Sequence, residues 1–342
     1  MNGNDTIDRG GARFDVCNGD ADGLCAVVQW RLQYPAPSSL VTGLKREIAL
    51  LDRVEAAAGD EVLVCDLSLE RNRAALMRLL ERGVRVRYFD HHAVSNVPRH
   101  PGLDAHIDLS AGACTSAIVD RFLGGAFRAW AAVGAYGDNL HALGERLARE
   151  AGVDAAGRER LRRLGEAINY NAYGEDESDV RIAPGRLYAL LARHRDPLHF
   201  AHEEPIAAEL DGLRSADLAR ALGIAPYWNG ATGSVHVLPD ARWSRRVIGS
   251  AANELAVAAP SRAHAVLRRR ADATMVASVR APLDSPSGAG ELCGRFGGSG
   301  RKAAGGIDRL PVEDLDRFVQ AFGAMQWGSA SPAADAASQG AP

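Results

Sequence analysis

Three features that would assign a class of protein at once are lacking from this sequence of 342 residues. No apolar stretch approaches the ~20 residues that span a bilayer, and the polar N-terminus lacks the apolar core of a signal peptide. The formal net charge is -3, whereas proteins that hold long nucleic acids by bulk electrostatics usually carry a basic excess. The five cysteines are scattered and form no C-x-x-C pair, which argues against a disulfide framework or a zinc ribbon. These absences predict a cytoplasmic protein with reduced cysteines and no membrane partner.

What is present is the composition of an ordinary globular chain, with 46% apolar and 24% charged residues, and its length favours two domains. The first half alternates short apolar runs with helical patterns, as βαβ units of a parallel sheet do. The expected strands are Arg13 to Cys17, Leu40 to Thr42, Glu61 to Cys65 and Val84 to Phe89. The expected helices between them are Leu24 to Leu32, Glu47 to Ala57 and Glu70 to Arg82.

The fold class that these patterns predict is α/β. We expect a parallel-sheet N-terminal domain over residues 13–185, connecting helices over 186–230, a smaller α+β domain over 231–328 and a disordered tail over 329–342.

Acidic residues and histidines follow the expected strands at the point where each strand ends. The run Asn18-Gly-Asp20-Ala-Asp22-Gly follows the first strand, Asp66 follows the third, and Asp90-His91-His92 follows the fourth. Carboxyl ends of parallel strands meet at one crevice, so these side chains should converge. Crowded carboxylates repel one another, and divalent cations cancel that charge. Oxygen ligands with imidazole favour Mn²⁺, with Mg²⁺ as the alternative, and a pair of such ions ~3.5–4 Å apart supports hydrolysis of phosphate esters.

These motifs, in this order, resemble those of the DHH phosphoesterases. Two further family motifs match the chain: a Gly-Asp after an apolar helix at Gly137-Asp138, and the glycine-rich signature of the DHH-associated domain at residues 297–306. The resemblance extends from about Phe14 to Gln326. It implies a catalytic metal-binding domain followed by a substrate-binding domain.

The resemblance also implies roles for individual residues. Asp20 and Asp66 would bind one ion, and Asp66 would bridge to a second ion held by Asp22, His91 and Asp138. His92 would contact the scissile phosphate or protonate the leaving oxygen, and Asp90 would orient an imidazole. The last assignment agrees with the need of metal-site histidines for a hydrogen-bonded partner.

The chain departs from the family pattern at two places. Asn18 stands where many members have a histidine, so Asn18 either coordinates weakly or leaves the first ion less tightly held. In the second domain a Gly-Gly-Gly-His run is replaced by Gly-Gly-Ser-Gly followed by two basic residues. We expect substrate contacts from this segment and from the arginine that ends the preceding strand, at Gly297, Gly298, Ser299, Gly300, Arg301, Lys302 and Arg280. A helix beginning near Lys302 would add a favourable dipole for an anion.

The residues leave structural alternatives open. Asp66 could cap a helix, the Asp20 to Gly23 run could form a turn, and Asp138 could cap a helix from Leu140. The expected activity is hydrolysis of phosphoester bonds in nucleotides or very short oligonucleotides, such as nano-RNA, cyclic dinucleotides or 3′-phosphoadenosine 5′-phosphate. A single-strand-specific exonuclease, a soluble pyrophosphatase and a non-catalytic nucleotide sensor are the alternatives, and a homodimer is left open.

Overall fold

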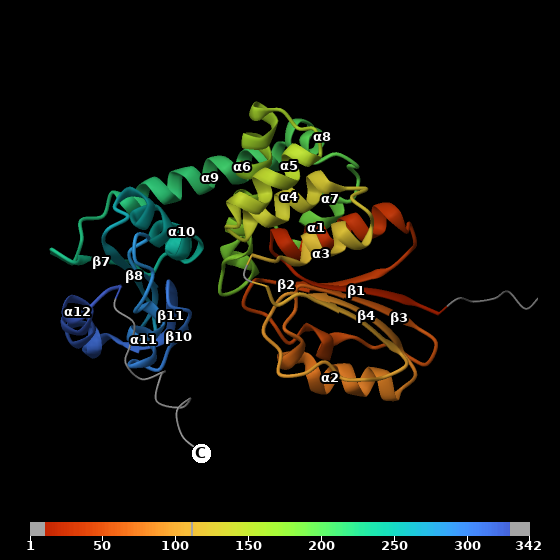
Figure 1. Cartoon of the computed structure of the whole chain (residues 1–342), viewed down its shortest axis with the longest axis horizontal. Coiled ribbons are helices and arrows are strands. Elements are labelled where there is room, and N and C mark those ends of the chain that lie inside the picture. The colour runs from red at the N-terminus through yellow and green to blue at the C-terminus, as the bar shows by residue number, and fades with distance from the viewer. Residues whose placement is uncertain (1–10, 111, 329–342) are drawn as a thin grey trace, which may run out of the picture. The chain divides into compact units, whose positions relative to one another are not determined.

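The computed structural model of the chain describes residues 11–110 and 112–328 (Figure 1). The chain divides into two compact units, Met1–Leu213 and Arg214–Pro342. The boundary between the units falls within the connecting segment expected at 186–230. The tail expected to be disordered, 329–342, lies outside the described residues.

The N-terminal unit is built on a parallel sheet with the strand order β2-β1-β3-β4-β5. Its strands are β1 (Arg13–Asn18), β2 (Ser39–Gly43), β3 (Glu61–Cys65), β4 (Arg85–Asp90) and β5 (Leu103–Ile107). The four strands expected from the sequence are present, and β5 is an addition. Since all the pairings in this sheet are parallel, the carboxyl ends of the strands lie along one edge.

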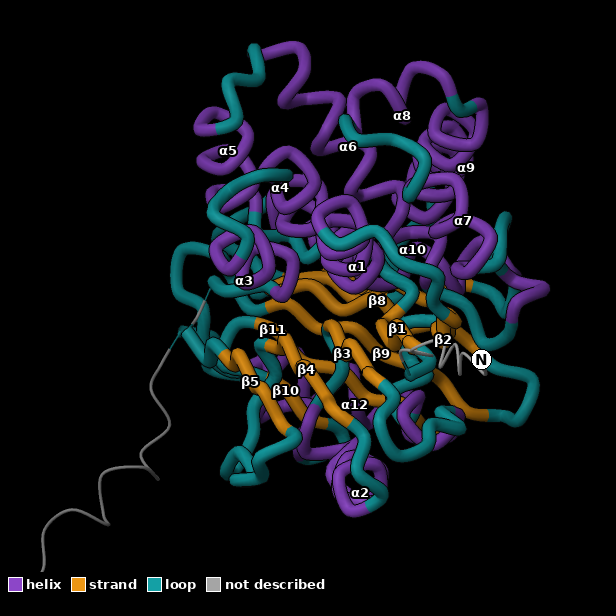
Figure 2. Tube along the Cα trace, turned by 90° about the vertical axis from the view of Figure 1, so that its right-hand side faces the viewer, coloured by secondary structure: helices purple, strands orange, loops and turns teal. Residues whose placement is uncertain are grey.

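Helices lie on both faces of this sheet. The helices up to the unit boundary are α1 (Ala21–Gln33), α2 (Leu69–Glu81), α3 (Thr115–Phe122), α4 (Arg128–Gly137), α5 (His141–Glu150), α6 (Ala155–Ala172), α7 (Pro184–Leu191), α8 (Pro197–Glu203) and α9 (Pro205–Leu222), which crosses that boundary, with 3-10 turns at Leu50–Arg53 and Glu177–Asp179. Figures 1 and 2 show α2 on one face and α1, α3 and α4 on the other.

The alternation of side chains along each strand explains this layered arrangement. Val62 and Val64 of β3 belong to the core beneath α2, whereas Leu63 and Cys65 belong to the core beneath α1 and α4. Both faces of β3 are therefore buried, as expected for a parallel sheet between two helical layers.

The helix expected over Glu47 to Ala57 is not formed, and this prediction is wrong. Only the 3-10 turn Leu50–Arg53 is present. The side chain of Asn72 in α2 accepts from Leu51 N at 3.3 Å and donates to Ile48 O at 2.9 Å. Main-chain groups of the segment are thus satisfied by a neighbouring helix, which removes the need for a helical hydrogen-bond pattern.

The C-terminal unit contains a mixed sheet with the order β10-β11-β9-β8-β7-β6, in which only β7 and β8 pair in parallel. Its strands are β6 (Trp228–Gly230), β7 (Gly233–Leu238), β8 (Ala263–Arg269), β9 (Thr274–Arg280), β10 (Ser299–Gly300) and β11 (Ala304–Pro311). Its helices are α10 (Arg242–Ala258), α11 (Ala289–Gly294) and α12 (Leu315–Ala324), with a 3-10 turn at Val312–Asp314. The expected hairpin between residues 264 and 280 is formed by β8 and β9.

The core of this unit is made by the sheet and by α11 and α12. Phe318 and Phe322 of α12 are completely buried against strand residues such as Val235 and Val279. The predicted fold class is confirmed: an α/β chain with a parallel-sheet N-terminal unit and a smaller α+β C-terminal unit. Within the described residues, no helix combines the length and the apolarity needed to cross a membrane.

Candidate metal centre

Three aspartates lie where strands of the N-terminal sheet end, and all three are buried. Asp20 follows β1, Asp66 follows β3 and Asp90 is the last residue of β4. Their side chains are 2%, 3% and 0% exposed. Burial removes the water that would solvate these charges, so each needs hydrogen bonds or cations in its place.

Asp22 is held by the first turn of α3. Its Oδ2 accepts from Thr115 N at 2.7 Å, and its Oδ1 accepts from Ser116 N at 2.7 Å and from Ser116 Oγ at 2.5 Å. These hydrogen bonds from the N-terminus of α3 orient the fully buried carboxylate. Close approach of α4 requires Gly134, since a Cβ there would lie 2.0 Å from Ser116 Oγ and 3.1 Å from Asp22 Oδ1.

His91 brings the carboxylates together. Its Nε2 lies 3.4 Å from Asp66 Oδ1, 3.6 Å from Asp138 Oδ2 and 4.0 Å from Asp22 Oδ2. Two groups of ligand atoms lie within 4.8 Å of one another, namely Asp22, His91 and Asp138, and Asp66, His91 and His92. We call Asp20, Asp22, Asp66, His91 and Asp138 the acidic site. The structure brings together all five residues that the sequence analysis named as metal ligands.

Asp66 adopts a main-chain conformation that side chains rarely take, with a φ of +58°. Its Oδ1 accepts from Thr115 Oγ1 at 3.3 Å. Burial, and then the carboxylates of Asp20, Asp22 and Asp138, raise the pKa of Asp66 well above its usual range. Strained backbone and crowded carboxylates cost stability, and such features cluster at functional sites. Asp66 precedes α2 without capping it, because the cap is the side chain of Ser68.

Asp138 follows the last residue of α4 and points to the same site. Burial raises its pKa to about 6, with Asp22 and Asp20 adding to the shift and Lys45 opposing it. The alternative that Asp138 caps the next helix is not supported, since α5 begins at His141 with Leu140 in the capping position.

Asp90 and His92 form a hydrogen-bonded pair at the same edge of the sheet. His92 Nδ1 lies 2.7 Å from Asp90 Oδ1, and Leu69 N donates to Asp90 Oδ2 at 3.3 Å. Burial lowers the pKa of His92, but the hydrogen bond to Asp90 and its negative charge outweigh burial, so the pKa is raised. The side chain of His92 is 43% exposed, which leaves its other nitrogen accessible to solvent or substrate. The sequence analysis expected Asp90 to orient an imidazole, and the imidazole it contacts is that of His92.

Lys45 is a component of the site that the sequence analysis missed. Its ammonium pairs with Asp20 Oδ2, lies 3.4 Å from Asp138 Oδ1 and donates to Asn169 Oδ1 at 3.1 Å. Burial lowers the pKa of Lys45, but the carboxylates of Asp20 and Asp138 raise it by more, so this pKa lies well above its usual range. A signal was present, because Lys45 follows the expected strand Leu40 to Thr42 just as the aspartates follow theirs.

Asn18 is turned towards the main chain. Its Oδ1 accepts from Asp20 N at 3.3 Å, and its Nδ2 donates to Lys45 O at 3.3 Å. Asn18 therefore ties the end of β1 to the segment after β2. These bonds position Asp20 and Lys45 beside each other.

In the C-terminal unit, the glycine-rich segment 297–306 forms a hairpin. Ser299 and Gly300 of β10 pair with Gly306 and Gly305 of β11. The helix expected to begin near Lys302 is absent, and this prediction is wrong. The pairing has a steric reason, because a Cβ at Gly300 would lie 2.4 Å from Gly305 Cα, so glycine lets the two backbones meet.

The other residues expected to contact substrate surround this hairpin or end the neighbouring strand. Arg301 and Lys302 are exposed at its turn. Gly297 has a φ of +73°, and Gly298 N donates to Cys293 O at 2.9 Å. Arg280, the last residue of β9, donates to Asn253 Oδ1 at 2.5 Å and to Ser278 Oγ at 3.1 Å. Their contacts with a substrate stay a prediction.

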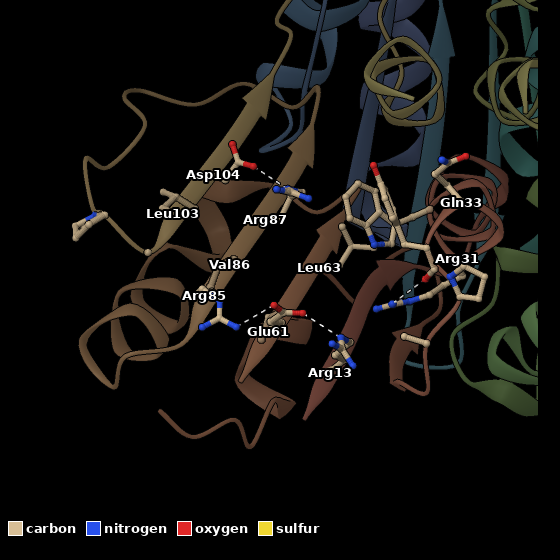
Figure 3. A pocket seen from close by; sticks show the side chains of 17 residues that line it. Arg13, Arg31, Gln33, Glu61, Leu63, Arg85, Val86, Arg87, Leu103 and Asp104 are labelled. Atoms are coloured by element: carbon tan, nitrogen blue, oxygen red, sulfur yellow. Dashed lines mark hydrogen bonds and ion pairs between the residues drawn. The ribbon is translucent and has the colours of Figure 1, made fainter. Parts of the chain in front are cut away.

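A separate cavity lies near the amino ends of the N-terminal strands (Figure 3). The acidic site lies at the carboxyl ends of these strands. The volume of the cavity is about 730 Å³. Glu61 pairs there with Arg13 at 3.0 Å and with Arg85 at 2.9 Å, and Arg87 pairs with Asp104 at 2.7 Å. Both carboxylates that line this cavity are thus paired with arginine, and with Arg31 the lining has more basic than acidic groups.

The parallel sheet with buried aspartates at its carboxyl edge, the histidine pair after β4 and the following α+β unit can be compared with known proteins. No protein-family model matches the sequence, and no curated protein matches it. Solved structures do match the fold.

The structure of exonuclease RecJ bound to manganese has a TM-score of 0.57 and 19% identity, covering 92% of this chain and 90% of that chain. The DHH domain of a member of the s1p family of ribosomal proteins has a TM-score of 0.58 and 14% identity, covering 92% of this chain and 86% of its own. The pGpG-specific phosphodiesterase PggH from Vibrio cholerae has a TM-score of 0.54 and 16% identity, covering 91% of this chain and 97% of that chain. This chain therefore has the fold of DHH-domain proteins.

Proposed function

We propose that this protein is a divalent-metal-dependent phosphoesterase that hydrolyses phosphoester bonds in nucleotides or short oligonucleotides. The observation that carries the proposal is the convergence of Asp22, Asp66, His91 and Asp138 on one point, with the oxygen and imidazole donors that Mn²⁺ or Mg²⁺ prefers. Structural charge pairs do not account for this convergence, because the carboxylates outnumber the cations around them.

The acidic site fits a divalent ion on chemical grounds. Asp22 is fixed by α3, Asp138 by the end of α4 and Asp66 by its main-chain conformation, so three carboxylates are directed at the imidazole of His91. An ion bound there would polarise a phosphoryl oxygen and lower the pKa of a water molecule. We infer that Mn²⁺ is the preferred ion and Mg²⁺ the alternative. The resemblance to the family implies two ions.

Asp90 and His92 supply the proton transfer in this proposal. Asp90 accepts a hydrogen bond from Nδ1 of His92 and, with its negative charge, favours the imidazolium form, in which Nε2 also carries a proton. Nε2 would then contact the phosphate or pass that proton to the leaving oxygen, leaving a neutral imidazole. Because Asp90 is completely buried and also accepts from Leu69 N, it is held in place and fixes the orientation of the imidazole ring.

We infer that the substrate is a nucleotide or a short oligonucleotide rather than a long strand. The net charge of -3 gives no general attraction for a long polyanion. One protein of similar fold is described as specific for pGpG and another as an exonuclease, so a single-strand-specific exonuclease is the second candidate. Arg280, Arg301 and Lys302 of the C-terminal unit supply the positive charge for substrate phosphates in this proposal.

The proposal also includes the cellular location and the oligomeric state expected from the sequence. A cytoplasmic location agrees with the five cysteines, which are all buried and unpaired. A homodimer stays a prediction.

Turnover of a panel of substrates in Mn²⁺ tests the proposal. The panel is a ribo-dinucleotide, a cyclic dinucleotide, 3′-phosphoadenosine 5′-phosphate, pyrophosphate and a single-stranded 20-mer. We expect one small substrate to be cleaved fastest. Faster processing of the 20-mer would favour the exonuclease, and tight nucleotide binding without any turnover would favour a non-catalytic sensor.

A further inference from the structure

The ammonium of Lys45 occupies the part of the acidic site that belongs to Asp20. Nζ pairs with Asp20 Oδ2, lies 3.4 Å from Asp138 Oδ1 and donates to Asn169 Oδ1 at 3.1 Å. The ring of Tyr173 lies beneath it, with Nζ 5.6 Å from the ring centroid. A cation is therefore already coordinated by two carboxylates, one amide oxygen and a ring face.

The two residues available for a first ion are otherwise engaged. The second oxygen of Asp20, Oδ1, accepts from Gly23 N at 3.1 Å, so both of its oxygens have partners. Asn18 uses its oxygen for Asp20 N and its amide for Lys45 O. In the resemblance to the family, Asp20 belongs to the first ion and Asn18 stands where many members have a histidine.

The ligand atoms that remain, apart from those of Asp20 and Asn18, are enough for one metal ion. Neither of the two groups found among the described residues includes Asp20, and both use the imidazole of His91. One imidazole nitrogen binds one ion, so the two groups cannot both be filled through His91 Nε2. The Nδ1 of His92 is in addition taken by Asp90 at 2.7 Å.

The identity of the basic residue is itself informative. Of the forty basic residues in the sequence, only Lys45 and Lys302 are lysines. Arginine supplies the guanidinium in many other ion pairs of the N-terminal unit, as at Arg31 with Asp15 and Arg87 with Asp104. An ammonium is a compact point charge, whereas a guanidinium is planar and larger. The acidic site thus has the basic side chain that most nearly matches a metal ion in size and charge distribution.

We propose that the ammonium of Lys45 takes the place of the first divalent ion, so that each chain binds a single ion, held by Asp22, Asp66, His91 and Asp138. This inference rests on the proposed function and specifies the composition of its site. A second divalent ion at Asp20 would lie within contact range of the ammonium and be repelled by it. Removing the charge of Lys45 should open a second site.

The number of bound ions tests this inference directly. Wild type, Lys45→Met and Lys302→Met are dialysed to equilibrium against Mn²⁺, and bound manganese is measured by elemental analysis. Lys302→Met is the matched control, since it removes the chain's other lysine from an exposed turn. We expect one ion per chain in wild type and in Lys302→Met, and two in Lys45→Met. Electron paramagnetic resonance on the same samples should show an isolated Mn²⁺ in wild type and a spin-coupled pair in Lys45→Met.

Each outcome separates this inference from the function on which it rests. Two ions in wild type, with a spin-coupled signal, would overturn the role of Lys45 and leave the metal-dependent phosphoesterase intact. One ion in both wild type and Lys45→Met would also overturn that role. No bound Mn²⁺ in wild type, or binding that survives in Asp66→Asn, would instead count against the proposed function itself.

Discussion

Charged side chains lie at both ends of the parallel sheet in the N-terminal unit, but the carboxylates at the amino end are paired with arginines whereas those at the carboxyl end are crowded together. At the amino end, Glu61 is paired with two arginines and Asp104 with one, and these side chains are between 37% and 63% exposed. At the carboxyl end, the side chains of Asp20, Asp22 and Asp66 are at most 3% exposed. Of these three carboxylates, Lys45 pairs with that of Asp20.

The difference between the two ends distinguishes a structural arrangement of charges from a functional one. Exposed, alternating ion pairs satisfy one another and contribute little to stability individually. Buried carboxylates with too few cations are costly unless a further cation binds. The acidic end of the sheet is therefore the place where a ligand is needed, although an open cavity of about 730 Å³ lies at the other end (Figure 3).

The largest effect is expected from Asp66→Asn. Asparagine tolerates the positive φ of this position and keeps the shape of the side chain while removing its charge. We expect kcat to fall about 10³-fold or more, equivalent to about 4 kcal/mol of lost transition-state stabilisation. Without metal, the unfolding temperature should be unchanged or higher, because the substitution relieves repulsion among carboxylates. A variant that keeps most of its activity, or that unfolds more easily, contradicts the role given to Asp66.

His92→Ala should cause the next largest loss. Removal of a general acid or base typically lowers the rate about 10²- to 10⁴-fold, and we expect kcat to fall within this range. The affinity for Mn²⁺ should stay the same, because His92 Nδ1 is bonded to Asp90 and the ion is assigned to other residues. A parallel loss of Mn²⁺ binding in this variant would show that His92 is a metal ligand instead.

Gly134→Ala tests how closely α4 must approach Ser116 and Asp22. The added Cβ would lie 2.0 Å from Ser116 Oγ, so the helix or the serine has to move. We expect a loss of about 1–3 kcal/mol in the free energy of unfolding, as for other overpacked positions. The control is Gly249→Ala in α10, where a Cβ meets no atom within 4 Å. Chemical denaturation of both variants should show destabilisation only for Gly134→Ala.

Glu61→Gln at the amino end should have the smallest effect. It breaks exposed pairs with Arg13 and Arg85, and such pairs contribute about 0.2–1 kcal/mol each. We expect a change of less than about 1 kcal/mol in unfolding free energy and unchanged turnover and Mn²⁺ binding. If this variant lost activity, the two ends of the sheet would not be functionally distinct.

The sequence predicts the sheet and the aspartates well because both depend on local patterns. Short runs of β-branched and aromatic residues define β3 and β4, and the acidic residues that follow them need only the geometry of a parallel sheet to converge. The conformation of the 47–57 segment depends on Asn72, which contacts it from another helix, so its own helical pattern is misleading. The hairpin at 297–306 likewise depends on backbone contacts across glycines that a local pattern does not reveal.

The composition of the site was harder to predict than its position. Thr115 and Ser116, which hold Asp22, lie more than ninety residues after it in the sequence, and no motif connects them. Lys45 follows β2 as the aspartates follow their strands, but a search for ligands of a cation does not select a cationic residue. Its role becomes apparent only from its distances to Asp20, Asp138 and Asn169.

The most direct test of the central claim is hydrolysis of a ribo-dinucleotide by metal-stripped wild-type protein, measured in EDTA and again as Mn²⁺ is added back. The buried, under-compensated carboxylates predict no cleavage in EDTA and recovery that saturates as Mn²⁺ fills the acidic site. Cleavage that continues undiminished in EDTA, or no cleavage of this or any other phosphoester at saturating Mn²⁺, would contradict it.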